Sequence, residues 1–256
     1  MDRRIVILAV ECDATNILVN ALKDKYPLTG IIYERPISKK TIIKNRIKSL
    51  GLWKVLGQIL FIITVPKLLS ASSKKRIKEI LVQNDLDISS VAGELITTIK
   101  SANSDDCINL LNAMQPSLVI LSGTRIISQK VLNNVNAVFI NIHAGITPLY
   151  RGVHGAYWAL VEDNSNLCGV TLHYVDKGID TGNIIAQGLI KPTRADNFST
   201  YPYLQMAEGI RLLNNNLPAV LQNTVQRTPL LTNKSQLRYH PTLLQYLKFY
   251  FTKKVK

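Results

Sequence analysis

The sequence has few cysteines and no long hydrophobic run at its N-terminus. Its three cysteines, Cys12, Cys107 and Cys168, are odd in number, widely spaced and without a Cys-x-x-Cys motif. This pattern indicates neither a disulfide framework nor a cysteine zinc site. The first apolar run, Ile5 to Val10, has only six residues before Glu11 and is too short for the core of a secretory signal. We therefore expect a cytoplasmic protein with reduced cysteines.

Acidic residues are missing from two stretches, 36–78 and 227–256, which hold eleven and seven Lys or Arg residues. The rest of the chain has thirteen basic residues against seventeen acidic ones, so the net charge of +14 arises in these two stretches. Such local positive charge favours an anionic partner, whether lipid phosphate, nucleic acid or a nucleotide. Charge alone does not choose among the three.

Short apolar runs separated by helical patterns predict an α/β fold. With 256 residues, 46% of them hydrophobic, the chain can bury a sizeable core. Continuous apolar strands alternating with helices are typical of a Rossmann-like, mostly parallel sheet covered by helices on both faces. The later runs 169–176 and 184–190 are expected to close one edge antiparallel. The four earlier strands are expected at 5–10, 28–35, 116–123 and 137–143, and two helices at 14–22 and 203–213.

Three regions follow from these patterns. Residues 1–217 are expected to form the catalytic domain, interrupted at 36–80 by a basic amphipathic helical insert, and residues 218–256 to form a basic C-terminal extension.

The insert combines apolar residues at helical spacing with lysines. Its apolar centre, between Lys54 and Lys67, is about twelve residues long, shorter than the ~20 that span a bilayer. We therefore expect it to lie on a membrane or pack on the protein, but not to cross a membrane. An interfacial helix attracted by anionic lipid and a helix packed on the sheet with a solvated lysine face both fit, and residues 241–256 leave the same choice open.

Three polar residues are placed to act on a carbonyl group. Asn141 and His143 are two residues apart at the end of a predicted strand, so their side chains share one face at the edge where α/β sheets bind ligands. Asp180 lies in a Gly-Ile-Asp-Thr-Gly turn that could return over this edge. An amide N–H stabilises a developing oxyanion, and an imidazole beside a carboxylate moves protons. Taken alone, the three could equally be a turn former, a strand-end histidine and a cap.

The surrounding motif resolves that ambiguity. The run Asn-x-His-x-x-x-x-Pro-x-x-Arg-Gly from Asn141 to Gly152, followed by Gly-Val-Thr-Leu-His-x-Val-Asp-x-Gly-Ile-Asp-Thr-Gly from Gly169 to Gly182, resembles the signature of folate-dependent formyltransferases. That family includes glycinamide ribonucleotide, methionyl-tRNA and amino-sugar formyltransferases. The resemblance is firm over residues 115–195 and weak or absent over 36–110 and 218–256.

The resemblance implies a role for each residue of the motif. Asn141 would bind the formyl oxygen, His143 would assist proton transfer, and Asp180 would tune His143 and help to deprotonate the amine. The implied donor is 10-formyltetrahydrofolate, and no metal is implied. The carrier loop, whose backbone would contact the pterin ring, would comprise Leu121, Ser122, Gly123, Thr124 and Ile126.

Five further residues near the motif receive an interpretation. Arg151 is a candidate contact for an anionic group, although a structural salt bridge explains it equally well. Gly152 is expected to permit a turn. His154 and His173 are interpreted as structural, and His240 shows no metal-ligand spacing with them.

Three acceptors compete. Glycinamide ribonucleotide enzymes resemble one another in a glycine-rich phosphate turn after the first strand, but this chain has no glycine before Gly30. Methionyl-tRNA enzymes resemble one another in a sizeable C-terminal RNA-contacting domain, for which about forty residues remain here. We therefore expect an amino-sugar N-formyltransferase acting on a nucleotide-linked sugar for polysaccharide biosynthesis. Tyr157 and Trp158 are candidate stacking residues for the acceptor, and ordinary helix packing is the alternative.

A non-enzyme alternative is a catalytically silent relative that binds nucleic acid or a membrane surface through its basic arms. An intact Asn, His and Asp centre argues against it. We do not expect a nucleic-acid partner, and peripheral contact with the anionic inner membrane face is the alternative to a purely cytoplasmic location. The sequence leaves the oligomeric state open.

Overall fold

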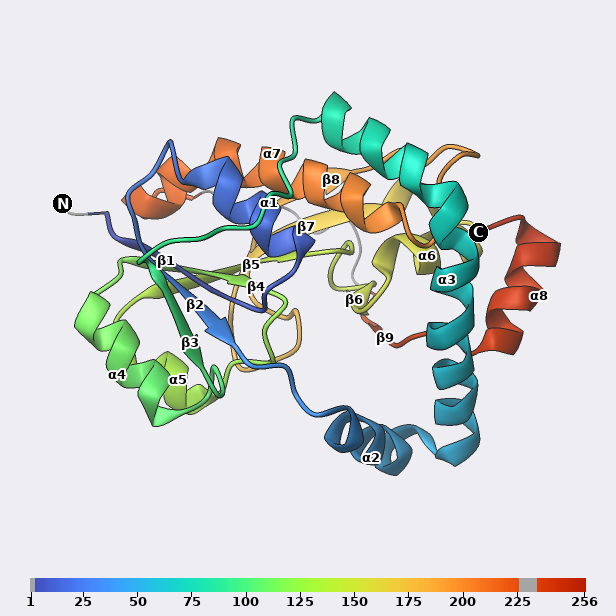
Figure 1. Ribbon diagram of the computed structural model, residues 1–256, viewed down its shortest axis with the longest axis horizontal. Helices are drawn as coiled ribbons and strands as arrows, with labels where there is room; N and C mark the ends of the chain where they lie inside the picture. The colour runs from blue at the N-terminus through green and yellow to red at the C-terminus, as the bar shows by residue number, and fades with distance from the viewer. Residues whose placement is uncertain (1–2, 226–233) are drawn as a thin grey trace.

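The computed structural model describes residues 3–225 and 234–256, which are built on a seven-stranded sheet (Figure 1). Its strand order is β3-β2-β1-β4-β5-β7-β8. Neighbouring strands from β3 to β5 are parallel, and β7 and β8 form an antiparallel edge, as predicted. The strands are β1 (Ile5–Ala9), β2 (Leu28–Glu34), β3 (Ile96–Ile99), β4 (Leu118–Ser122), β5 (Val138–His143), β7 (Gly169–Tyr174) and β8 (Ile184–Leu189).

Helices cover both faces of the sheet. The strands need this cover because their alternate residues point to opposite sides and both sets are apolar. In β1, Ile5 and Ile7 join the core under one helical layer, whereas Val6 and Leu8 join the core under the other. The first layer consists of α1 (Asp13–Leu22) and α7 (Tyr201–Gln222), and the second of α4 (Asp105–Met114) and α5 (Gln129–Asn134). The predicted Rossmann-like arrangement is confirmed.

A third core lies beyond the edge of the sheet. It gathers aromatic side chains around α6 (Gly155–Val161), which is followed by a short 3-10 helix, Ser165–Leu167. The ring centroids of Phe61 and Phe198 are 4.8 Å apart, and those of Tyr157 and Phe198 are 5.3 Å apart. This core connects segments that are distant in the sequence.

The predicted helical insert is two helices, α2 (Lys39–Leu50) and α3 (Leu52–Gln83). Gly51, at φ +84°, separates them, since a left-handed backbone conformation ends α2 and is readily adopted by glycine. At 32 residues α3 is far longer than its apolar centre suggested, and it continues through Pro66. In Figure 1, α2 projects away from the sheet while α3 runs along one side of the molecule.

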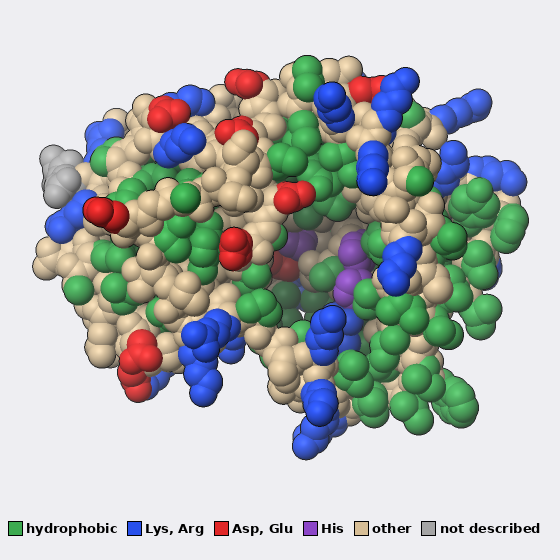
Figure 2. Space-filling view, viewed as in Figure 1, with side chains coloured by type: hydrophobic (Ala, Val, Ile, Leu, Met, Phe, Trp, Pro, Cys, Tyr) green, Lys and Arg blue, Asp and Glu red, His purple; other side chains and the backbone are tan. Residues whose placement is uncertain are grey.

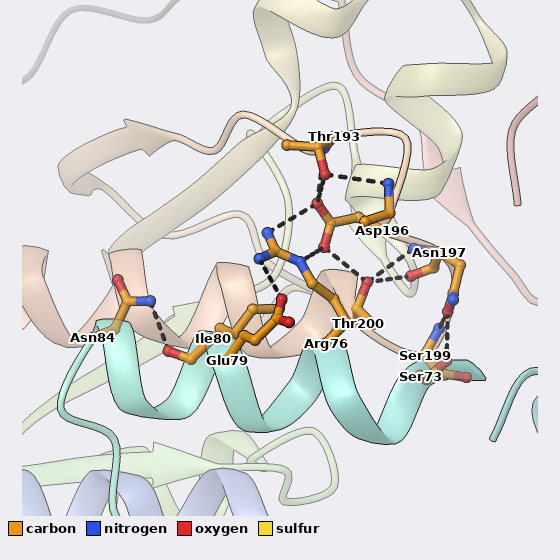
Figure 3. A network of polar contacts seen from close by, with 11 residues as sticks. Ser73, Arg76, Glu79, Ile80, Asn84, Thr193, Asp196, Asn197, Ser199 and Thr200 are labelled. Atoms are coloured by element: carbon orange, nitrogen blue, oxygen red, sulfur yellow. Dashed lines mark hydrogen bonds and ion pairs between the residues drawn. The ribbon is translucent and has the colours of Figure 1, made fainter. Parts of the chain in front are cut away.

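A polar network fixes the C-terminal half of α3 to the loop before α7 (Figure 3). The guanidinium of Arg76 donates two hydrogen bonds to Asp196, at 2.8 and 3.2 Å, and the Asp196 carboxylate is buried. The Ser73 hydroxyl donates to the side chain of Asn197 at 3.1 Å. The helix is therefore an integral part of the fold.

The C-terminal residues are also integrated. Helix α7 continues to Gln222, so the boundary expected after residue 217 falls inside a helix. Strand β9 (Leu237–Arg238) pairs with β6 (Arg151–Gly152), and α8 (Leu243–Lys253) packs against α3. Residues 234–256 thus complete the third core through Tyr246 and are more than an appendage.

The length of α3 corrects one expectation. By length and composition α3 could cross a membrane, whereas the apolar centre between Lys54 and Lys67 had suggested that it could not. One such helix is weak evidence for a membrane span.

Candidate active site

A cleft of about 440 Å³ lies at the carboxyl ends of β4 and β5, where parallel α/β sheets bind ligands. Asn141 and His143 leave β5 on the same side and line it, as predicted. Asp180 lines the same cleft beside His143, so the structure brings the three predicted residues together. Figure 2 shows a hollow on this face of the molecule, with histidine side chains inside it.

Hydrogen bonding fixes the orientation of the His143 ring. Its Nε2 is 2.7 Å from the carbonyl oxygen of Tyr150, which can only accept, so Nε2 carries a proton. The other ring nitrogen, Nδ1, lies 3.3 Å from Oδ2 of Asp180. Nδ1 is therefore the nitrogen that can gain or lose a proton beside the carboxylate.

The Asp180 side chain is held by backbone contacts. Its Oδ2 accepts a hydrogen bond of 2.9 Å from the amide of Gly152. Gly152 has a φ of +92°, and a Cβ atom there would lie 2.3 Å from the carbonyl oxygen of Arg238, so glycine is required. Gly152 lies in the short strand β6, so the turn predicted at this position is wrong, although the positive φ explains why a glycine is needed there. Asp180 itself has a φ of +51°, in the left-handed region that aspartate tolerates better than most residues.

His173 is a residue of the site that sequence reasoning missed. It was interpreted as structural, but it lies directly opposite Asn141 in the β5–β7 ladder and lines the cleft. Its Nδ1 donates to the carbonyl of Tyr174 at 2.7 Å, so Nε2 accepts from the Asn141 amide at 3.2 Å. The antiparallel pairing of 137–143 with 169–176 was the signal that could have found it.

The surroundings of His173 favour its neutral form, in which Nε2 can accept the hydrogen bond from the Asn141 amide. Burial lowers the pKa of His173 and outweighs the opposing effect of the bond to Tyr174. The neutral ring then orients the Asn141 amide with one N–H. The second N–H of this amide is available to a ligand in the cleft.

The predicted carrier loop forms another wall of the cleft. Leu121, Gly123, Thr124 and Ile126 line it, whereas the Ser122 hydroxyl instead contacts Thr15 at 2.9 Å. The backbone of β4 points alternate side chains to opposite faces, which explains why Ser122 turns away. The loop therefore contributes four of the five predicted residues to the cleft.

Glu34, at the end of β2, anchors this loop and was not predicted. Its buried carboxylate accepts hydrogen bonds from the backbone amides of Ala102 and Arg125, at 2.9 and 2.6 Å. It also forms an ion pair with the guanidinium of Arg125. Because a buried carboxylate needs such partners, Glu34 fixes the position of Arg125 and hence of the loop.

The predicted acceptor contacts at Tyr157 and Trp158 are wrong. Both side chains are buried in the third core, and the Trp158 indole donates to the carbonyl of Tyr239 at 3.0 Å. The alternative interpretation, helix packing, is what the structure shows. Apolar burial explains why two large aromatic residues follow one another in α6.

Two further residues near the motif have structural contacts. Arg151 donates to the carbonyl of Ile179 at 3.2 Å and so braces the turn that carries Asp180. His154 is half-buried and contacts His240, with 2.8 Å between their ring nitrogens. The structural interpretation of His154 is confirmed.

The sequence matches the profile of the formyl transferase family over residues 39–203, more than half of the chain. The match includes α2 and α3, where the signature motif gave little resemblance. Among curated relatives, the methionyl-tRNA formyltransferase of Staphylococcus epidermidis is 30% identical over 130 residues. That alignment covers 51% of this chain and 42% of the relative, so the chain matches about two fifths of the relative's length.

Two solved structures show the same fold at low identity. One is the phosphoribosylglycinamide formyltransferase of Anaplasma phagocytophilum, with 16% identity, a TM-score of 0.58, and coverage of 93% of this chain and 98% of that one. The other is the formyltransferase PseJ of Anoxybacillus kamchatkensis, in complex with UDP-4,6-dideoxy-4-formamido-L-AltNAc and tetrahydrofolate. It has 18% identity, a TM-score of 0.50, and coverage of 92% and 85%.

Proposed function

The chain belongs to the formyl transferase family, and we propose that it moves a formyl group from 10-formyltetrahydrofolate to the primary amine of a nucleotide-linked amino sugar. The observation that carries the transfer reaction is the convergence of Asn141, His143 and Asp180 on one cleft. An amide, an imidazole and a carboxylate from distant parts of the chain meet there. Their chemistry suits acyl transfer to an amine.

Asn141 is proposed to stabilise charge on the formyl oxygen. When the amine nitrogen attacks the formyl carbon, the C=O electrons move onto oxygen, and a preorganised N–H donor stabilises them. His173 holds the Asn141 amide through one N–H, which supports use of the other for this purpose. Removing one such donor typically costs roughly 10²–10³ in kcat.

His143 and Asp180 are proposed to manage protons. The attacking amine must lose a proton as the new C–N bond forms, and the departing nitrogen must gain one as the old C–N bond breaks. The Asp180 carboxylate lies within reach of His143 Nδ1, so a proton can pass between the two groups without leaving the cleft. The Gly152 amide keeps Oδ2 in position during this exchange.

The carrier loop fits a folate co-substrate. Apolar side chains, among them the half-exposed Ile126, lie beside backbone polar groups of Gly123 and Thr124 along the cleft. A flat heteroaromatic ring needs this combination of apolar surface and few hydrogen-bonding groups. When bound, 10-formyltetrahydrofolate supplies the activated formyl group, and the loop together with Val175 would hold its ring system.

Two observations support an amino-sugar acceptor. The segment Val10–Cys12 between β1 and α1 has no glycine, which argues against the phosphate turn of the purine enzymes. The PseJ structure, whose fold this chain shares, contains a UDP-linked formamido sugar together with tetrahydrofolate. The cytoplasm as the site of this reaction is part of the same proposal.

Methionyl-tRNA is the second candidate acceptor. The curated relative with 30% identity is named a methionyl-tRNA formyltransferase. In addition, the net charge of +14 would favour an RNA substrate. The two acceptors make different predictions about salt. Because phosphate contacts release counterions, tRNA formylation should weaken steeply between 50 and 200 mM salt, whereas a small nucleotide sugar makes far fewer contacts.

An acceptor panel tests the proposal. Purified protein with 10-formyltetrahydrofolate is offered UDP- and dTDP-linked amino sugars, glycinamide ribonucleotide and methionyl-tRNA, and formylated products are detected by mass spectrometry. We expect turnover with a nucleotide-linked amino sugar and little with the others. Preferential formylation of methionyl-tRNA would overturn the acceptor, and no transfer to any amine would overturn the reaction.

A further inference from the structure

The outer face of α3 exposes large apolar side chains at helical spacing. Trp53, Leu56, Leu60 and Ile63 are 85%, 41%, 49% and 50% exposed, and steps of three, four and three residues put them on one side of the helix. Scattered surface leucines are common, but a continuous exposed apolar stripe marks an interaction surface.

Helix α8 enlarges this surface. It packs beside α3, with Tyr246 directed at Phe61 and ring centroids 5.4 Å apart. On the side away from this contact, Leu244 is 78% and Phe251 is 65% exposed. Figure 2 shows hydrophobic side chains gathered over this edge of the molecule, where Figure 1 places α3 and α8. We call these residues of α3 and α8 the apolar edge.

One side of α3 packs on the rest of the protein, so only its apolar outer side is free to contact a partner. The opposite side of α3 is buried through Val55, Phe61 and Val65, and the buried Gln58 amide donates to the carbonyl of His240 at 2.7 Å. Farther along, Arg76 is paired with Asp196. A helix with protein along one side and apolar residues along the other can lie in the plane of an interface, as amphipathic interfacial helices do.

The charge around the apolar edge selects the kind of partner. All nine lysines of α2 and α3 are exposed, and residues 36–78 contain no acidic residue. Lys54 and Lys67 lie at the two ends of the apolar stripe, and Lys248 is exposed on α8. Two such surfaces from two copies of the chain would repel each other, whereas anionic lipid headgroups would attract both.

We propose that the apolar edge attaches the protein to an anionic membrane surface, with Trp53, Leu56 and Phe251 entering the headgroup region and the lysines contacting lipid phosphates. The combination of apolar residues with adjacent cations is what interfacial binding requires. This attachment is independent of formyl transfer, because none of these residues lines the cleft.

Tryptophan fluorescence gives a direct test. The chain has two tryptophans, the exposed Trp53 and the buried Trp158. Vesicles of phosphatidylcholine with phosphatidylglycerol should shift the emission to the blue, and phosphatidylcholine alone should not. The shift should be absent in Trp53→Phe, which leaves Trp158 as a matched internal reference. An unchanged emission spectrum at low salt, together with no co-sedimentation, overturns the proposal.

Vesicle co-sedimentation separates the two contributions. Leu56→Glu should abolish binding, whereas Val82→Glu, an equally simple change at the 74% exposed C-terminal end of α3, should not. Lys54→Gln with Lys67→Gln should weaken binding about 25-fold at low salt, since each lysine contributes roughly a factor of five. The control pair Lys23→Gln with Lys25→Gln, exposed near the end of α1, should have little effect.

Self-association is the competing outcome. Light scattering coupled to gel filtration should show the same oligomeric state for the wild type and Leu56→Glu. A dimer that Leu56→Glu dissociates, combined with no vesicle binding by the wild type, would assign the apolar edge to a second copy and overturn the proposal. Normal formyl transfer by Leu56→Glu would show that the failure concerns attachment alone.

Discussion

At the residue scale, contacts to the backbone fix which ring nitrogens of the proposed centre face its other side chains. The Tyr150 carbonyl takes one ring nitrogen of His143, and the Tyr174 carbonyl takes one of His173. Each histidine therefore presents a defined nitrogen, His143 to Asp180 and His173 to Asn141. Such fixed orientation is the preorganisation on which electrostatic catalysis depends.

His173 is expected to act as a positioning residue for Asn141. His173→Leu should lower kcat by roughly 10²-fold, the cost of losing one oriented oxyanion donor, with little change in KM for either substrate. Steady-state kinetics measures the split between kcat and KM, with the exposed Lys191→Ala as a control. A change confined to KM would show that His173 does not act through Asn141.

Arg125 is expected to hold the carrier loop through Glu34. Arg125→Ala leaves the buried Glu34 carboxylate without its ion-pair partner, so the loop should lose its fixed position. We predict a KM for 10-formyltetrahydrofolate raised at least severalfold and an unchanged KM for the acceptor. The control is Lys130→Ala, whose ion pair with Asp105 is exposed on both sides. Equal effects on both KM values would contradict the role of the loop in binding the donor.

The half-buried pair of His154 and His240 predicts a loss of stability in acid. Burial lowers the pKa of His154 to about 3 and of His240 to about 4, while the unfolded chain titrates near 6.5. Below pH 6.5 the unfolded state therefore binds protons that the folded state does not, so stability falls as the pH drops toward 4. The loss should reach about 2 kcal/mol per histidine between pH 7 and 5.

Urea unfolding at pH 7 and pH 5 measures this loss. His154→Asn should flatten the pH dependence, because asparagine does not titrate and tolerates the left-handed backbone at this position. An identical pH dependence in the variant and the wild type would contradict the assignment.

At the scale of elements, α3 joins two parts of the molecule. Its N-terminal half contributes Phe61 to the aromatic core, and its C-terminal half is docked by Arg76 onto Asp196. Burial tends to raise the pKa of Asp196, but the Arg76 hydrogen bond and those from Thr193 lower it overall. The ionised, buried carboxylate therefore depends on Arg76.

Removing Arg76 should destabilise the protein. Arg76→Met is expected to cost roughly 3 kcal/mol, because it leaves the Asp196 charge buried without its partner. Urea unfolding gives the size of the loss, and hydrogen exchange should show increased opening along the second half of α3. Glu79→Ala, on the exposed side of the same guanidinium, should change stability by no more than about 0.5 kcal/mol.

Elements with a strong pattern were predictable, and those without one were not. The apolar runs at 5–10 and 137–143 gave β1 and β5, because strands buried on both faces need continuous apolar residues. Strand β3, with the sequence Ile-Thr-Thr-Ile, is short and half polar because it lies at the edge of the sheet. The full length of α3 escaped prediction because its second half mixes lysines with residues that are buried only by tertiary contacts, and the sequence does not show those contacts.

At the scale of the whole molecule, the site was predictable where chemistry and topology coincide. Asn141 and His143 could be placed because residues two apart at a strand end share a face, and the motif added Asp180. Tyr157 and Trp158 were misassigned because a sequence does not show which side of α6 faces the core. His173 and Glu34 depend on strand pairing and loop closure, which no local pattern records.

The measurement that tests the central claim most directly is the turnover of Asn141→Ala, His143→Ala and Asp180→Ala with the acceptor that the wild type formylates. Each variant should keep its circular dichroism spectrum and lose roughly 10²–10⁴-fold in kcat, the range for an oxyanion donor or a general acid–base group. Wild-type turnover in all three folded variants would contradict the claim that formyl transfer takes place at this centre.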